Sequence, residues 1–128
     1  MRDEEHQLQC ACVRWFAYQY PQYKGLLFAI PNGSYRTKAT AGKLKAEGVV
    51  AGVADLILLV PRRLEIGQCG GIPWYRIYHA LCIEMKTAKG RQSPEQKEWQ
   101  AKVECEGYKY AVCRSLDEFM AVVNGYLT

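Results

Sequence analysis

The chain has 128 residues, of which 49% are apolar and 23% are charged, and its formal net charge is +4. This length suits one compact domain over residues 1–128, with enough apolar residues to bury a core without disulfide staples. No apolar run reaches the roughly 20 residues of a membrane-spanning helix, and the charged start at residues 2–5 is unlike a secretory signal or a transit peptide. We therefore expect a soluble, intracellular, cytoplasmic protein.

The N-terminal part of the chain predicts a helix followed by a short strand. Residues 4–20 favour a helix with Asp3 as its N-cap and acids in its first turn, where the helix dipole favours them. Pro21 ends that pattern. The apolar run Leu26–Ile30 is typical of a strand, and the turn signal Pro31-Asn32-Gly33 stops it.

The middle of the chain predicts a second helix and two strands. Thr37 can cap a lysine-bearing helix that ends before Gly48, and Asp55–Val60 is an almost unbroken apolar strand. Residues 61–74 are rich in glycine and proline and predict a loop or a hairpin. Ile77–Lys86 predicts a longer strand. Because both of its faces are largely apolar, we expect it to lie centrally in a covered sheet.

The C-terminal part predicts two capped helices with a strand between them. The segment Ser93–Gln96 combines a cap, a proline at the first helical position and a glutamine three residues after the cap, and predicts a helix to about Glu106. Tyr108–Arg114 is typical of a strand, and Ser115–Glu118 predicts a second capping box that opens a helix to about Leu127. The whole order favours a mixed α/β sheet covered by helices on both faces.

The six cysteines include no C-x-x-C pair, so the ligand spacing typical of zinc sites is absent. Cys82 and Cys113 lie inside apolar strand-like runs, where a thiol behaves as a small hydrophobic group. We expect reduced cysteines that fill space in the fold.

Positive charge gathers in two segments. Residues 31–48 hold four basic residues against one acid, and residues 86–102 hold five against two. Such clusters suit a phosphate backbone, which is bound without regard to sequence. The alternative is an ordinary solvated surface.

Two carboxylates occupy positions where a buried core would be expected. Asp55 begins one apolar strand, and Glu84 lies within the other. A charge there costs several kcal/mol unless it is paired or binds a metal (~2–7 kcal/mol for polar groups and more for charges). Lys86 follows Glu84 by two residues and therefore points to the same face. One interpretation is structural: a Glu–Lys pair at the end of the strand, with Asp55 capping a turn.

The other interpretation is metal-assisted hydrolysis of a phosphodiester. The small-residue segment Gly48–Asp55 lets a bulky partner approach the first carboxylate, and Gln96 lies in the first turn of the next predicted helix. Mg²⁺ prefers hard oxygen ligands, which Asp55 and Glu84 could supply together with the backbone carbonyl of Met85. Lys86 would orient the attacking water or stabilise charge in the transition state. The number of metal ions stays open.

The motifs taken in order resemble the virus-type replication-repair nuclease (VRR-NUC) domain, a branch of the PD-(D/E)XK nuclease superfamily. The resemblance covers most of the chain. It rests on Glu5-His6-Gln7-Leu8-Gln9 with Trp15, Pro31-Asn32-Gly33, Gly48 with Gly52-Val53-Ala54-Asp55-Leu56, Ile83-Glu84-Met85-Lys86-Thr87, Gly90-Arg91-Gln92-Ser93-Pro94-Glu95-Gln96 and Gly107-Tyr108.

The resemblance implies a restriction-endonuclease-like core that depends on Mg²⁺ or Mn²⁺. Asp55, Glu84 and Lys86 match the catalytic Asp, Glu and Lys of the family. Glu5 matches its first-helix glutamate, a further metal-site residue, although the adjacent Glu4 is an alternative register. Gln96 matches a polar residue close to the site. The sequence departs from the family at Ala54, where proline is usual, and this change removes no ligand.

The resemblance also implies a substrate and an assembly. We expect a structure-selective DNA endonuclease that acts on branched DNA such as four-way junctions or flaps, works as a homodimer, and needs neither a membrane nor an organic cofactor. The alternative is a non-catalytic nucleic-acid-binding module of a larger complex, and RNA stays open as a ligand. The residues that we expect to contact DNA are Asn32, Arg36, Lys38, Lys43, Lys89 and Arg91.

Overall fold

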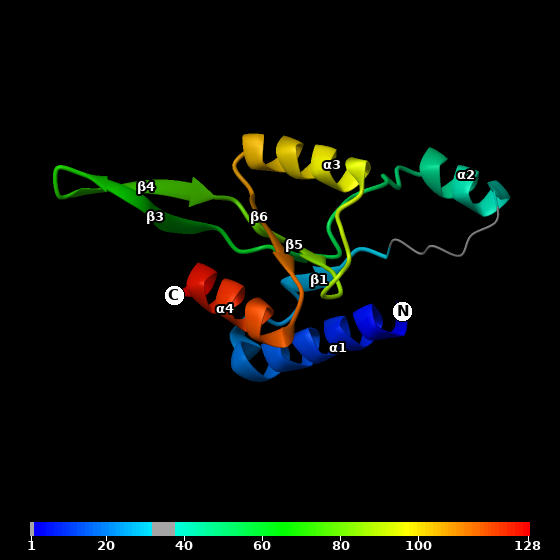
Figure 1. Ribbon diagram of the computed structural model, residues 1–128, viewed down its shortest axis with the longest axis horizontal. Helices are drawn as coiled ribbons and strands as arrows, with labels where there is room; N and C mark the ends of the chain where they lie inside the picture. Colours follow the sequence, from blue (N-terminus) through cyan, green and yellow to red (C-terminus); the bar gives the residue numbers. More distant parts are fainter. Residues whose placement is uncertain (1, 32–37) are drawn as a thin grey trace.

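The computed structural model describes residues 2–31 and 38–128 and shows a four-stranded mixed sheet between helices (Figure 1). The helices are α1 (Arg2–Gln19), the short 3-10 helix η1 (Pro21–Tyr23), α2 (Lys38–Ala46), α3 (Pro94–Cys105) and α4 (Leu116–Leu127). The strands are β1 (Leu27–Ala29), β2 (Leu56–Leu58), β3 (Arg62–Cys69), β4 (Ile72–Tyr78), β5 (Leu81–Met85) and β6 (Lys109–Cys113). The predicted mixed α/β class is confirmed.

The main sheet has the strand order β1-β2-β5-β6. The first two pairings are antiparallel, and β5 pairs with β6 in parallel. All five residues of β5 are buried, as expected for a central strand that is covered on both faces.

The helices form one layer on each face of this sheet (Figure 1). On one face, α1 and α4 cover a core that includes Leu56, Leu81 and Ile83, and α1 supplies Cys12 and Phe16 to it. On the other face, α3 covers a smaller cluster that is centred on Cys82 and Tyr110. Alternate residues of β2, β5 and β6 therefore face two different cores.

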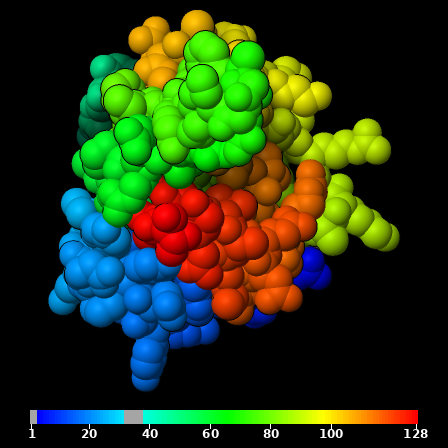
Figure 2. Space-filling model, turned by 90° about the vertical axis from the view of Figure 1, so that its left-hand side faces the viewer, coloured from blue at the N-terminus to red at the C-terminus, as the bar shows by residue number. Residues whose placement is uncertain are grey.

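Strands β3 and β4 pair only with each other and project from the body as a hairpin (Figure 1). In Figure 2 this green hairpin stands out toward the viewer, above the red end of α4. The single strand expected over 77–86 is wrong. Tyr78 pairs with Arg62 in the hairpin, and pairing with the main sheet begins at Leu81. His79, between the two strands, donates its N–H to the Gly107 carbonyl.

The capping predictions are partly confirmed. Ser93 and Gln96 form the full capping box of α3. At α4 the Ser115 side chain accepts from the Glu118 N–H, but the Glu118 carboxylate accepts from the Arg114 N–H, so that box is incomplete. Asp3 lies inside the first turn of α1 rather than at its N-cap.

All six cysteines are free thiols, and Cys82 and Cys113 are buried as expected. Within residues 2–31 and 38–128, no helix is both long and apolar enough to cross a membrane. The predicted turn at 31–33 and the cap Thr37 lie wholly or largely outside the described residues, as do Asn32 and Arg36.

Candidate active site

The register of the sheet brings Asp55 and Glu84 together. Leu56 of β2 pairs with Ile83 of β5, so Asp55, the next residue, lies opposite Glu84. Directly opposed residues in an antiparallel pair point to the same face. The two carboxylates therefore lie side by side at one end of the sheet, on the face that α3 covers.

Asp55 is held in place by two backbone N–H groups, one at the end of β5 and one just after β1. Its side-chain Oδ2 accepts from the Met85 N–H at 2.7 Å, and its carbonyl accepts from the Ile30 N–H at 2.9 Å. A charge-assisted bond of this kind orients a carboxylate firmly. Asp55 also lines the pocket.

Glu84 is 2% exposed, and neighbouring side chains contact both of its oxygens. Gln96 Nε2 donates to Oε2 at 2.9 Å, and the Tyr110 hydroxyl donates to Oε1 at 3.3 Å. Lys86 Nζ lies 3.8 Å from Oε2 and is itself mostly covered. The predicted Glu84–Lys86 pair on one strand face is therefore present.

Burial dominates the electrostatics of Glu84. It raises the pKa of this carboxyl to about 8, with a further rise from the neighbouring Asp55 carboxylate and a partial offset from Lys86 and Tyr110. Burial and the Glu84 charge likewise raise the pKa of Tyr110. Two carboxylates this close repel each other unless a proton or a cation lies between them.

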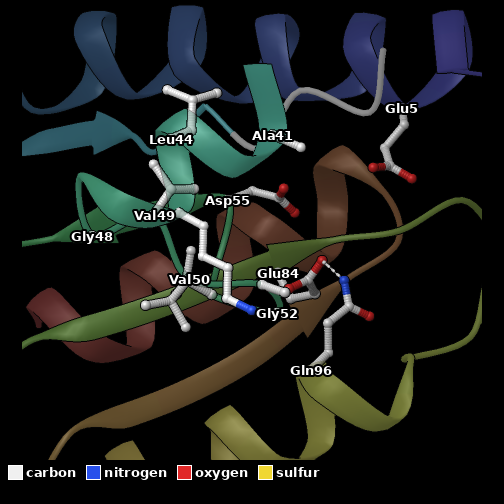
Figure 3. A pocket seen from close by; sticks show the side chains of 13 residues that line it. Glu5, Ala41, Leu44, Gly48, Val49, Val50, Gly52, Asp55, Glu84 and Gln96 are labelled. Atoms are coloured by element: carbon white, nitrogen blue, oxygen red, sulfur yellow. Dashed lines mark hydrogen bonds between the residues drawn. The ribbon is translucent and has the colours of Figure 1, made fainter. Parts of the chain in front are cut away.

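Glu5 completes the acidic side of the site. Burial raises its pKa and Asp55 raises it further, whereas Lys86 lowers it. Glu5 extends from α1 toward the same pocket as Asp55 and Glu84 (Figure 3), while Glu4 is exposed and does not line this pocket. The structure thus brings Glu5, rather than Glu4, to the other predicted residues.

These residues line a cavity of about 850 Å³. Glu5, Asp55, Glu84 and Gln96 form one side of it, and the aliphatic residues of α2 and of the 48–53 loop form the other (Figure 3). Gln96 has two roles at once. Its Oε1 accepts from the Ser93 N–H in the capping box, while its Nε2 reaches Glu84. Its own N–H donates to Ser93 Oγ, so that N–H is not directed at a ligand.

The 48–53 loop is fixed against the start of α3 at Gly52. This residue has a φ of +87°, and a Cβ there would lie 2.6 Å from the carbonyl carbon and oxygen of Glu95. Only glycine suits both the left-handed conformation and the close approach. The loop that leads into Asp55 and the helix that carries Gln96 are therefore held together.

The expected DNA contacts divide into three groups. Lys38 and Lys43 are exposed on α2, the helix that contributes Ala41 to the pocket. Lys89 and Arg91 are exposed on the segment between β5 and α3. Two carbonyls of that segment accept from the guanidinium of Arg114. Asn32 and Arg36 lie outside the described residues.

Sequence reasoning missed several residues of this site. Tyr110 lies in the strand predicted over residues 108–114 and was given no role there, yet it donates to Glu84 and accepts from Gln92 Nε2 at 3.2 Å. The parallel register of β5 and β6 places Tyr110 beside Cys82, on the face of Glu84. Lys45 and the valines of the 48–53 loop also line the cavity. Nothing in their local pattern distinguishes them from ordinary surface residues.

The donor set suits a hard divalent cation. Asp55 and Glu84 present carboxylate oxygens to one cavity, and neither cysteine nor histidine lines it. Among the described residues, no three His, Cys, Asp or Glu side chains gather closely enough to hold a metal ion together. Asp55 and Glu84 are the two carboxylates that could contact such an ion directly, and Glu5 lies across the cavity from them (Figure 3).

Comparisons with known proteins identify the family of this chain. The VRR-NUC domain family matches residues 3–117 of the chain. A solved structure described as "VRR_NUC domain protein" is similar with a TM-score of 0.73 and 27% sequence identity, over 96% of this chain and 87% of that chain. No curated protein matches. The chain belongs to the VRR-NUC family, and its fold is that of a nuclease-type, DNA-processing domain.

Proposed function

We propose that this protein is a metal-dependent, structure-selective DNA endonuclease that hydrolyses phosphodiester bonds in branched DNA, such as four-way junctions or flaps, during replication, repair or recombination. One observation carries the proposal. Asp55 and Glu84 lie opposite each other on adjacent strands in one cavity, with Lys86 Nζ 3.8 Å from Glu84. A binding surface for a polyanion gains nothing from two partly or fully buried carboxylates.

Asp55, Glu84 and the Met85 carbonyl would hold Mg²⁺ or Mn²⁺, with Glu5 contributing through water. A bound divalent ion would polarise the phosphodiester and lower the pKa of a coordinated water. Glu84 is kept in position by Gln96 and Tyr110, and Asp55 by the Met85 N–H. The acidic side of the cavity is thus preorganised before DNA binds.

Lys86 is the residue that acts on the reacting groups. Its ammonium is mostly covered and next to Glu84, so it can orient the attacking water and stabilise negative charge on the phosphate as the water oxygen bonds to phosphorus. Gln96 has a positioning role through Glu84. The assignment of Glu5, Asp55, Glu84, Lys86 and Gln96 to catalysis is part of the proposal.

Exposed basic residues would hold the DNA backbone around this cavity. Lys89 and Arg91 follow the Lys86 strand end, and Lys38 and Lys43 lie on α2. We include Asn32 and Arg36 on the basis of the sequence. A two-fold dimer would present two sites to two strands of a junction. Light scattering at working concentrations tests this part of the proposal, and a monomer alone would count against it.

The proposal is tested by one cleavage assay. Labelled four-way junction, flap, splayed-arm, linear duplex and single-stranded DNA are incubated with Mg²⁺, Mn²⁺ or EDTA. Lys86→Ala is the test variant. The matched control is Lys102→Ala, which removes an exposed lysine of α3 that pairs with Glu98.

We expect cutting that requires metal, favours branched DNA, disappears in Lys86→Ala and persists in Lys102→Ala. Tight binding without cutting in every metal would instead favour a non-catalytic nucleic-acid-binding module. Equal cutting of all five DNAs would remove the selectivity from the proposal and leave the nuclease.

A further inference from the structure

The cavity has a second side that phosphate chemistry does not explain. Opposite the carboxylates it is lined by aliphatic side chains, and Figure 3 shows Leu44, Val49 and Val50 grouped away from Glu84 and Gln96. Val49 is 38% exposed and Val50 is 54% exposed. We define this aliphatic wall as Ala41, Leu44, Val49, Val50 and Ala51.

The aliphatic wall is held at a fixed place relative to the carboxylates. Its loop is attached to α2 by hydrogen bonds from the Gly48 and Val49 N–H groups to carbonyls of that helix. At its other end Gly52 contacts the backbone of α3 at Glu95, beside the Gln96 that holds Glu84. A wall connected to the reacting centre in this way can select which group lies next to the scissile phosphate.

The occupant must have one anionic part and one apolar part. A phosphodiester next to Asp55 and Glu84 supplies the first. The apolar surfaces of a nucleic acid are the sugar C–H groups, the thymine methyl group and the base faces. The base faces are the largest of these, and stacking covers them in a paired duplex. Lys45, in the same lining, offers a cation to a flanking phosphate. At about 850 Å³ the cavity is large enough for a nucleotide, since small-ligand pockets span about 300–1,000 Å³.

We infer, on the basis of the proposed function, that the aliphatic wall receives the sugar and base of one unstacked nucleotide beside the scissile phosphate. A phosphodiester flanked by an unpaired nucleotide can therefore enter the site more readily than one inside a continuous duplex. Aliphatic groups make no directional hydrogen bonds, so the wall accepts any base. Selectivity for branched DNA then comes from the cavity itself, without reading the sequence.

The first test compares cleavage of two DNAs that share the cut strand. In one DNA the strand is fully paired, and in the other the nucleotide at the mapped cut is unpaired. The variant is Val49→Thr with Val50→Thr, which keeps the side-chain shape but adds two hydroxyl groups. Its control is Val13→Thr, because Val13 is 40% exposed on α1 and does not line the cavity.

We expect the wild-type protein to cut the unpaired DNA with the higher kcat/KM. The double variant should lower that preference about ten-fold, the value of one buried valine side chain, and Val13→Thr should keep it. A preference within about two-fold of wild type in the double variant, with cleavage intact, would overturn the inference. Because the substituted valines are exposed, the variant should fold, and its Tm checks this.

The second test does not depend on cleavage. The nucleotides at and next to the branch point of a four-way junction are replaced in turn by 2-aminopurine, whose fluorescence rises when it leaves a base stack, and this DNA is bound in Ca²⁺. We expect a rise with the wild-type protein, a smaller rise with the double variant and the wild-type rise with Val13→Thr. Equal signals in all three proteins would overturn the inference. If no protein cuts any DNA, the proposed nuclease fails while this signal still decides the role of the wall.

Discussion

The β5 end of the main sheet and the β3–β4 hairpin are both built from strands, but they have opposite surroundings. All five residues of β5 are buried between helices, and this strand carries Glu84. Neither hairpin strand has a buried residue, and Ile72, Trp74 and Ile77 are more than half exposed. An isolated two-stranded hairpin is only marginally stable. The proposed catalytic residues lie where neighbouring strands and helices fix every side chain. We therefore expect substitutions at this end of the sheet to have larger effects than substitutions in the hairpin.

The largest expected difference is between two carboxylates, one from each region. Asp55→Asn should lower the cleavage rate by about 10³-fold, or about 4 kcal/mol, because it removes a metal-binding charge while its amide oxygen can still accept from the Met85 N–H. Glu65→Gln, on the exposed hairpin strand β3, should leave the rate unchanged. Single-turnover cleavage in Mg²⁺ measures both. Equal losses would show that the sheet end is not the reacting centre.

Gly52→Ala should have the next largest effect. A Cβ would lie 2.6 Å from the Glu95 backbone, so either the loop or α3 must move, and both position the site. We expect a loss of about 2–4 kcal/mol of stability together with slower cleavage. Gly25→Ala is a matched control, because Gly25 has the same φ of +87° with nothing within 4 Å of a Cβ. Thermal unfolding should show a clearly smaller loss there, and an equal loss would mean that only the backbone conformation matters.

Glu84→Gln should change how stability depends on pH. In the metal-free folded protein the pKa of Glu84 is about 8, above its ordinary value of 4.5, so between these values the folded state holds a proton that the unfolded state releases. The free energy of unfolding therefore falls as pH rises from 4.5 to 8. Because the amide of the Glu84→Gln variant does not titrate, the variant lacks this fall in the free energy of unfolding. We expect the free energy of unfolding of the variant to exceed that of wild type by about 1–3 kcal/mol at pH 8 and to equal it at pH 4. Tm measured in EDTA across this range checks the sign, and a gain confined to low pH would contradict it.

Lys89→Ala with Arg91→Ala should weaken DNA binding without changing the fold. Both residues are exposed beside the Lys86 strand end, and each phosphate contact contributes about 0.9 to the slope of log affinity against log salt. We expect that slope to fall by about 1–2. The control is Arg63→Ala on the hairpin. The guanidinium carbon of Arg63 lies 4.3 Å from the centre of the Tyr75 ring. An unchanged slope in the double variant would remove this segment from the DNA contact.

We expect the smallest effects from substitutions in the exposed β3–β4 hairpin. Ile72→Ser and Trp74→Ser replace side chains that are 69% and 59% exposed, so little burial is lost on folding. We expect each to change stability by less than about 0.5 kcal/mol and to leave the cleavage rate per site intact. Chemical denaturation measures the first, and the cleavage assay the second. A large loss of stability would show that the hairpin packs against more than itself.

Local signals in the sequence predicted much of the fold. The Ser93–Gln96 capping box, the N-terminal helix and the apolar strand that carries Glu84 each depend on neighbours along the chain, and each is present. The alternation of Glu84 and Lys86 predicted their shared face, and the observed pair agrees. These features need no knowledge of distant partners.

Features that depend on distant partners could not be predicted. The chain changes sheets between Tyr78 and Leu81 because β4 pairs with β3 whereas β5 pairs with β2 and β6. The Tyr110 contact with Glu84 depends on the parallel register of β5 and β6. The aliphatic wall forms only when α2 and the 48–53 loop meet the carboxylates in space.

Titration of the metal-free protein with Mn²⁺ tests the central claim most directly, namely that Asp55 and Glu84 form a divalent-metal site. Calorimetry is run on wild type, Asp55→Asn and the hairpin control Glu65→Gln. We expect saturable Mn²⁺ binding in wild type and in Glu65→Gln, and its loss in Asp55→Asn. Binding of equal strength in all three proteins, or in none of them, would contradict it.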